Sequence, residues 1–268
     1  MRLPFSIGLQ MAQKPSVDLN SDLGEGYGAW SMGEDAALLG IVTSANIACG
    51  GHAGDADTMF ETLTLARTNG VIIGAHPGYA DRTGFGRRII PMSVAGIERM
   101  VATQIGALMG AAALAGASVR YVKAHGALAN LAADSPDIAA AIARATGAIS
   151  RDLALLAISG TELETAGTKA GLQVFSEVFA DRAYQSNGRL VPRNNPLSMI
   201  HDADFAAKRL IALLETGLMP TLDGPAVRLA AQSICVHGDS PGAIVMALHI
   251  RGALNHAGIA LAPFLAPA

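Results

Sequence analysis

Short apolar runs alternate with longer segments of helical periodicity along most of the 268-residue chain. The runs are rich in Val, Ile, Leu and Ala, which is typical of strands that a parallel sheet buries on both faces. The first strand begins at Val17, and the others are expected at 41–49, 71–75, 119–123, 153–158, 172–177 and 233–236. Strands that alternate with helices predict βαβ units and a parallel sheet.

The segments between these strands carry helix signals, such as Asp55 before one helix and Ser135-Pro136 at the start of another. Helices are expected at about 35–39, 56–68, 93–115, 136–146, 162–169, 202–215 and 242–256. About seven such units, with no change of composition that marks a linker, predict a TIM-like (β/α) barrel. An open doubly wound sheet is the alternative. We expect residues 17–268 to form one domain, preceded by an N-terminal extension at 1–16.

Composition narrows the class of protein. Hydrophobic residues make up 51% of the chain and aromatic residues only 4%, so the core must consist of closely packed aliphatic side chains. The net charge is −3 and the chain has no basic run, so we expect no nucleic-acid partner. No apolar segment reaches the roughly 18 residues of a membrane span. Cys49 and Cys235 lie in apolar runs, which predicts buried, reduced thiols and a cytoplasmic protein.

Polar residues, several of them histidines beside glycine, follow the expected strands. They are Asp22, Glu25, His52, Asp55, His76, Lys123, His125, Glu177, His237 and Asp239. In a (β/α) barrel the carboxyl ends of the strands meet at one face, where the chemistry takes place. Asp55 and Asp239 can equally be helix caps. We interpret His201, His249 and His256 as structural.

Two long loops carry arginines. The loop 79–91 contains Asp81 and the pair Arg87 and Arg88, and it can act either as a lid that clamps an anion or as a solvated charged loop. A later loop contains Arg189 and Arg193. No Gly-x-Gly-x-x-Gly motif follows the first strand and the chain has no Walker loop, so the usual nucleotide sites are not encoded.

Seven sequence blocks together resemble the LamB/YcsF family. They are Asp-Leu-Asn-Ser-Asp-Leu-Gly-Glu (18–25), Ser-Ala-Asn-Ile-Ala-Cys-Gly-Gly-His-Ala-Gly-Asp (44–55), Gly-Ala-His-Pro-Gly (74–78), Gly-Phe-Gly-Arg-Arg (84–88), Val-Lys-Ala-His-Gly-Ala-Leu (122–128), Phe-Ala-Asp-Arg-Ala-Tyr (179–184) and Val-His-Gly-Asp (236–239). The blocks extend from about residue 17 to 250 in the order of the family. Ala124 and Ala129 replace a proline and a tyrosine that are usual there, which can alter the shape of the pocket.

The resemblance implies a barrel akin to those of glycoside hydrolases and deacetylases. It also implies the role of the A subunit of a bacterial ATP-dependent 5-oxoprolinase, which opens the lactam of 5-oxoproline to L-glutamate. The family requires separate B and C subunits for this activity. We therefore expect these partners to handle ATP with Mg, in agreement with the missing phosphate loop. A homo-oligomer is left open.

Opening an amide ring requires an activated carbonyl, a nucleophilic water and a proton for the leaving nitrogen. We expect Asp22 or Glu25 to orient or deprotonate water, with help from His52. His125 or His237 would protonate nitrogen, His237 being paired with Asp239. The residues expected to bind substrate are Asp18, Asn20, Asn46, His76, Arg87, Arg88, Lys123 and Arg182.

Two other functions stay open from the sequence. A metal-dependent deacetylase or amidohydrolase would hold a divalent cation through Asp18, Asp22, His52 and His125. A non-catalytic subunit would only bind or channel an intermediate for its partners, although binding alone rarely needs so many titratable groups.

Overall fold

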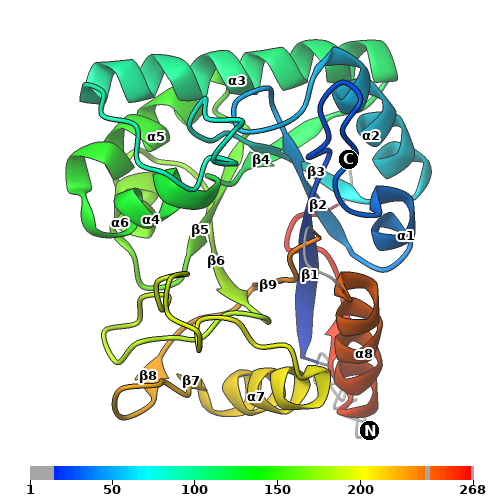
Figure 1. Ribbon diagram of the computed structural model, residues 1–268, viewed down its shortest axis with the longest axis vertical. Coiled ribbons are helices and arrows are strands. Elements are labelled where there is room, and N and C mark those ends of the chain that lie inside the picture. Colours follow the sequence, from blue (N-terminus) through cyan, green and yellow to red (C-terminus); the bar gives the residue numbers. More distant parts are fainter. Residues whose placement is uncertain (1–14, 239–241, 267–268) are drawn as a thin grey trace, which may run out of the picture.

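The structure, a computed structural model, describes residues 15–238 and 242–266. At its centre lie seven parallel strands, each paired with the next along the chain. They are β1 (Ser16–Leu23), β2 (Ser44–Ala48), β3 (Ile72–His76), β4 (Val119–Val122), β5 (Ala154–Ile158), β6 (Val174–Phe179) and β9 (Ser233–Cys235). Because β9 also pairs with β1, the sheet closes into a barrel (Figure 1). The predicted barrel of about seven units is confirmed, and the open sheet is excluded.

Helices cover the outside of the barrel. They are α1 (Asp35–Leu39), α2 (Ala56–Thr68), α3 (Val94–Ala115), α4 (Gly126–Asp134), α5 (Pro136–Ile149), α6 (Glu162–Lys169), α7 (Ala203–Thr216) and α8 (Ala243–His256). The long α3 crosses one side of the molecule and packs on α2 and α5, while α7 and α8 pack together on the opposite side (Figure 1). Asp55 caps α2 as predicted, since its side chain accepts a hydrogen bond from the Thr58 amide at 2.8 Å.

Several elements were not predicted. Helix α4 begins directly after His125, whose side chain makes no capping hydrogen bond, so the sequence carries no start signal there. Strands β7 (Leu218–Met219) and β8 (Val227–Arg228) form a short antiparallel pair outside the barrel. Strand β10 (Ala260–Leu261) pairs with the start of β1 at Ser16 and Val17. Of the extension expected at 1–16, residues 1–14 lie outside the described part of the chain.

The barrel interior is apolar at one end and polar at the other. Near the amino ends of the strands, the buried Tyr121 and Ile72 pack with Phe264 and Leu265 from the carboxyl-terminal segment. The rings of Tyr121 and Phe264 lie 5.0 Å apart. The Tyr121 hydroxyl then donates to Asn46 Oδ1 at 2.6 Å, which joins this apolar plug to the polar layer above it. The interior therefore directs polar chemistry to the carboxyl ends of the strands.

No helix in the described ranges combines the length and the apolar character that crossing a bilayer requires. This agrees with the absence of a long apolar run in the sequence.

Gly74 makes room for the Tyr121 ring, because a Cβ added at Gly74 would lie 2.2 Å from Tyr121 Cε2. We expect Gly74→Ala to lower the free energy of unfolding by about 1–3 kcal/mol, the usual cost of overpacking a core. Gly106→Ala on the exposed face of α3 is the matched control, since its Cβ would meet nothing within 4 Å. That variant should gain up to about 1 kcal/mol from helix propensity. Urea denaturation measures both, and equal effects of the two substitutions would contradict this packing.

Candidate active site

A cavity of about 540 Å³ opens at the carboxyl ends of the strands. The acidic, basic and imidazole groups on its wall are Asp22, Glu25, His76, Arg87, Lys123, His125, Asp134, Glu177, Arg182, Arg189, Arg193 and His237. Most of them follow directly from strand ends, as expected for a parallel barrel. The sequence therefore located the end of the barrel at which this cavity opens.

Lys123 lies at the floor of this cavity and is almost fully buried. Its Nζ is 2.9 Å from Asp22 Oδ1 and 2.9 Å from Glu177 Oε1, and it donates to Cys235 Sγ at 3.1 Å. Burial by itself would lower the pKa of Lys123, but the carboxylates of Asp22 and Glu177 raise it well above its usual value. The lysine is therefore a charged ammonium group held between two acids.

The pKa values of the two acids that contact Lys123 are shifted in opposite directions. Burial alone would raise the pKa of Asp22, but His76 and Lys123 lower it well below the usual range. Burial raises the pKa of Glu177, and this effect exceeds the opposing effect of Lys123. Asp22 is therefore the ionised partner of the lysine. An ionised acid with so low a pKa is a weak base, which argues against the expected role of Asp22 in deprotonating water.

Two carboxamides beneath the cavity position these acids. Asn46 Nδ2 donates to Asp22 Oδ1 at 2.8 Å and to Asn20 Oδ1 at 2.7 Å. Asn20 Nδ2 in turn donates to Glu177 Oε1 at 3.0 Å and to the Ser233 hydroxyl at 2.6 Å. Neither amide lines the cavity, so the structure places both residues behind the acids instead of against a substrate.

Asp18 lies deeper still and does not reach the cavity. Its carboxyl accepts hydrogen bonds from the hydroxyls of Thr43 and Ser44 at 2.6 Å each, and from Ser233. Burial raises its pKa to about 6. Asp18 was expected to bind substrate or a metal, but here it joins β1 to its neighbours β2 and β9.

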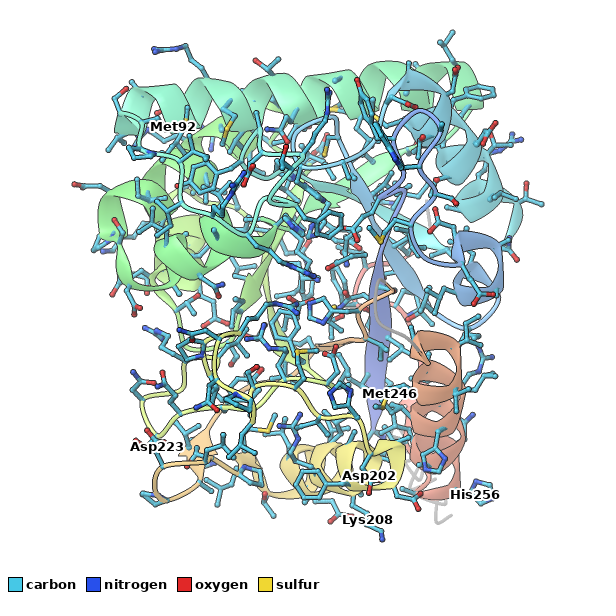
Figure 2. All side chains as sticks on the ribbon, in the orientation of Figure 1. Met92, Asp202, Lys208, Asp223, Met246 and His256 are labelled. Atoms are coloured by element: carbon cyan, nitrogen blue, oxygen red, sulfur yellow. The ribbon has the colours of Figure 1, made fainter. Side chains whose placement is uncertain are left out.

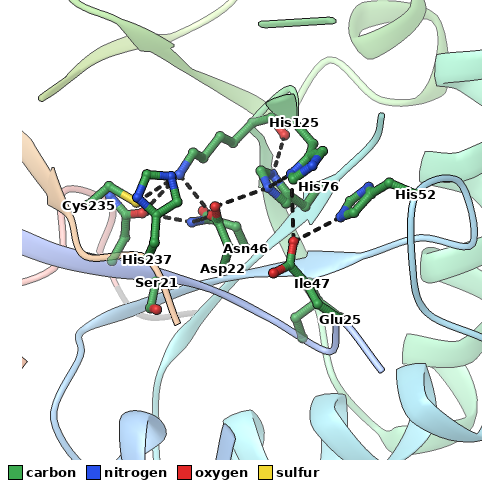
Figure 3. A network of polar contacts seen from close by, with 12 residues as sticks. Ser21, Asp22, Glu25, Asn46, Ile47, His52, His76, His125, Cys235 and His237 are labelled. Carbon is green, nitrogen blue, oxygen red and sulfur yellow. Dashed lines mark hydrogen bonds and ion pairs between the residues drawn. The ribbon is translucent and has the colours of Figure 1, made fainter. Parts of the chain in front are cut away.

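One acid and three histidines converge at one end of the polar network. Glu25 Oε1 is 2.9 Å from His52 Nε2 and 3.6 Å from His125 Nδ1, and His125 Nδ1 is 3.0 Å from His76 Nε2 (Figure 3). The ring of His52 stacks on that of His125 with centroids 3.6 Å apart. These four side chains form the histidine cluster. Burial lowers the pKa of His52 to about 3 and that of His125 well below its usual value, so both rings are neutral.

Close backbone approach makes the histidine cluster compact. Gly86 has φ +61°, and a Cβ there would lie 2.8 Å from both His52 Cβ and His125 Cδ2. The preceding Phe85 also has a positive φ of 53°, which is uncommon outside glycine, and its carbonyl oxygen lies 2.8 Å from His125 Nε2. The strained turn at 85–86 thus positions the ring of His125.

His237 lies at the other end of the network, where Figure 3 shows it across Asp22 from the histidine cluster. Its Nδ1 is 2.8 Å from Asp181 Oδ2, and its ring stacks on Phe179. Burial would lower the pKa of His237, but Asp181 outweighs burial and raises it. The expected partner, Asp239, lies outside the described residues, and the partner observed is Asp181. His237 is thus the histidine best suited to donate a proton.

The arginines divide between the cavity and the surface. Arg87 and Arg182 line the cavity as predicted, and Arg189 and Arg193 from the later loop join them. Arg88 instead pairs with Asp81, and 62% of its side chain is exposed. The lid loop thus turns one arginine inward and its neighbour outward, so the expected substrate contact of Arg88 does not form.

Sequence reasoning left several functional residues out of the expected site. Glu177 lies at a predicted strand end, and Arg189 and Arg193 lie in a predicted loop. Nothing in the sequence distinguished them from other polar residues in such positions. Asp181 lay within a block that resembles the family, and only its contact with His237 reveals its role. Among the other histidines, His249 pairs with Asp204 on the surface, and His256 lies at the periphery on α8 (Figure 2).

Fold and site together define a (β/α)-barrel protein with a charged cavity at the carboxyl ends of its strands. The chain belongs to the LamB/YcsF family, whose profile matches residues 17–268. It is 49% identical over 250 residues to the A subunit of 5-oxoprolinase from Nitrobacter hamburgensis, covering 93% of this chain and 98% of that protein. It is 52% identical over 248 residues to the corresponding 5-oxoprolinase protein of Paracidovorax citrulli, covering 92% and 99%.

A solved relative confirms the fold. The crystal structure of a lactam utilization protein from Thermus thermophilus superposes with a TM-score of 0.86 at 41% identity, covering 92% of this chain and 98% of that one. A protein of Enterococcus faecalis V583, 12% identical, shares the fold with a TM-score of 0.56 over 94% of this chain and 98% of that one. The architecture is thus a TIM-like (β/α) barrel.

Asp18→Asn tests the buried acid at the base of the site. Because the folded pKa of about 6 exceeds the ordinary 3.8, Asp18 favours the fold at low pH. This contribution to the free energy of unfolding amounts to roughly 3 kcal/mol. It is complete below about pH 4 and is lost as the pH rises through 6. Asparagine does not titrate, so the free energy of unfolding of the variant, relative to wild type, should rise by that amount between about pH 4 and pH 7. Urea denaturation at both pH values measures it, and parallel pH profiles would refute the assignment.

Proposed function

We propose that this chain is the A subunit of an ATP-dependent 5-oxoprolinase, which opens the lactam of 5-oxoproline to L-glutamate together with separate B and C subunits. The relatives named as the A subunit of 5-oxoprolinase and as a lactam utilization protein support a lactam substrate. The observation that carries the proposal is a cavity with the histidine cluster at one end, a histidine paired with an acid at the other, and arginines on the wall.

The arginines suit the carboxylate of 5-oxoproline. Arg182 is buried and donates to the Val191 carbonyl at 2.7 Å, which holds its guanidinium at the wall of the cavity. Burial lowers the pKa of Arg182 to about 10, which still leaves the group charged at neutral pH. Arg193 Nη2 lies 3.5 Å from His237 Nε2, so a further positive charge lies beside this histidine. An anionic substrate is favoured in such a field.

The two ends of the cavity suit the two proton steps of ring opening. The histidine cluster at one end can hold and orient the attacking water. His237, which Asp181 orients and favours in its protonated form, can protonate the leaving nitrogen from the other end. Lys123 lies between them with its charge already in place, where it can stabilise negative charge on the former carbonyl oxygen.

The ATP-dependent step is assigned to the partner subunits in this proposal. An amide carbonyl is a poor electrophile, and phosphorylation of its oxygen by ATP would activate it. The sequence contains neither a Walker loop nor a dinucleotide fingerprint. The free, buried thiols of Cys49 and Cys235 suit a reducing cytoplasm, where we place the complex.

The direct test is glutamate release from 5-oxoproline and ATP by this protein alone, by B and C alone, and by all three together. We expect glutamate only from the complete mixture. Asp22→Asn should lower the rate at least 100-fold because it disturbs the charge balance of Lys123, while co-elution with B and C persists. His249→Gln on the surface is the control and should keep the wild-type rate. Turnover without this chain, or none under any condition, would refute the proposed function.

Asp181→Asn tests the proton donor through the pH profile. Asp181 raises the pKa of His237, so its loss lowers that pKa. An acid catalyst loses activity as the pH rises through its pKa, and the alkaline limb of the rate profile should therefore move to lower pH in the variant. Asp204→Asn, which removes the acid of the surface pair with His249, is the matched control. A variant that lost rate equally at every pH would assign Asp181 a purely structural role.

A further inference from the structure

The hydrogen bonds of two histidines fix where their ring protons lie. His76 Nδ1 is 2.8 Å from the backbone oxygen of Lys123, and His125 Nε2 is 2.8 Å from that of Phe85. A carbonyl oxygen can only accept, so both of these ring nitrogens carry the proton. When the rings are neutral, the other two nitrogens, His76 Nε2 and His125 Nδ1, therefore carry no proton, and each presents a lone pair.

These two lone pairs face each other at 3.0 Å. Two acceptors at that distance repel each other unless a cation lies between them. His76 Nε2 also lies 3.4 Å from Asp22 Oδ2, which brings a carboxylate to the same side of the ring. Glu25 Oε1 lies 3.6 Å from His125 Nδ1 and adds a negative charge to the same point. The arrangement of lone pairs and carboxylates favours a cation at this point.

We infer that Glu25, His76 and His125 bind a divalent transition-metal cation of the Zn²⁺ type through Oε1, Nε2 and Nδ1. Ligands at 2.0–2.1 Å from a tetrahedral metal lie about 3.3 Å from one another. The separations of 3.0 and 3.6 Å lie on either side of that value, and all the candidate ligand atoms of the histidine cluster lie within 4.8 Å of one another. Imidazole nitrogen with one carboxylate oxygen is a common ligand set for such metals.

His52 orients a ligand of this site and does not bind the metal itself. Histidines that bind a metal almost always donate their second ring N–H to a fixed acceptor. His76 and His125 meet this condition, whereas His52 Nδ1 is buried without a hydrogen-bond partner among the described residues. His52 Nε2 instead lies 2.9 Å from Glu25 Oε1, where it can donate and orient the carboxylate.

The three ligands face the cavity and His52 does not. A metal held by Glu25, His76 and His125 therefore keeps at least one coordination position open toward the substrate space, as catalytic zinc sites do. Such a position can ionise a bound water near neutral pH. The site goes beyond the proposed function, because metal binding by this chain requires neither the lactam nor the partner subunits.

The test is metal binding by the full-length chain after treatment with a chelator. We expect one equivalent of Zn²⁺ in calorimetric titration, and visible absorption typical of low coordination number when Co²⁺ is added. His76→Gln and His125→Gln should each weaken binding at least 100-fold. His52→Gln should weaken it only about 10- to 100-fold, the usual effect of losing a group that orients a metal ligand.

The control variants separate this site from other candidates. His237→Gln removes a member of the second group of potential ligands, Asp22, Cys235 and His237, and should leave Zn²⁺ affinity within a few-fold of wild type. His249→Gln should also leave it unchanged. Circular dichroism identifies any variant that fails to fold. If a ligand variant does not fold, anomalous diffraction from wild-type crystals grown with Zn²⁺ tests the same assignment, because it locates the ion directly.

Several results would overturn the site. One is the absence of stoichiometric Zn²⁺ binding by the wild-type protein. Another is loss of Zn²⁺ binding in His237→Gln but not in His76→Gln, and a third is anomalous density away from Glu25, His76 and His125. Because these measurements contain no lactam, ATP or partner, they can fail while glutamate release succeeds, and they can succeed while glutamate release fails.

Discussion

A buried ammonium group at the centre of the barrel is the constraint on which the polar layer depends. Lys123 has almost no contact with water, so its charge must be balanced by a nearby carboxylate, and hydrogen bonds to the polar groups around it offset their burial. Asp22 supplies the negative charge, Glu177 gives the ammonium a second contact with an acid, and Asn20 with Asn46 hold the two acids in place. Removing one partner from a buried ion pair typically costs about 3–5 kcal/mol, so these residues form one unit.

The same burial has opposite results at the two ends of the cavity because the neighbours differ. His52 and His125 pack against other rings and the backbone, and burial keeps them neutral. His237 has Asp181 within hydrogen-bond distance, and this carboxylate outweighs burial. Titratable groups whose environments push their pKa values apart are what acid and base chemistry requires. One cavity can thus contain both lone pairs and a proton donor.

Much of this site was predictable because a parallel barrel gathers all its strand ends at one face. His52, His76, His125 and His237 are far apart in sequence, yet the strand periodicity predicted their common location, and all four lie in the network of Figure 3. The direction of a loop side chain was not predictable. Arg87 and Arg88 are adjacent, but the contact of Arg88 with Asp81 directs only Arg87 to the cavity. Helix α4 was missed because its first turn lacks a capping side chain.

The sequence by itself determined the alternation of strands and helices, the order of these units and the edge of the sheet where their polar residues gather, because these follow from local periodicity and from the way parallel strands align. Closure of the sheet into a barrel was favoured by the number of units and was decided by the pairing of β9 with β1. Only the tertiary structure decided which polar residues act together. It placed Asp18 among hydroxyls below the cavity, paired His237 with Asp181, and brought the lone pairs of His76 and His125 face to face. The physical reason is that pairing, burial and proton position depend on distances of a few ångströms between segments far apart in the chain, which the spacing of residues along a sequence does not encode.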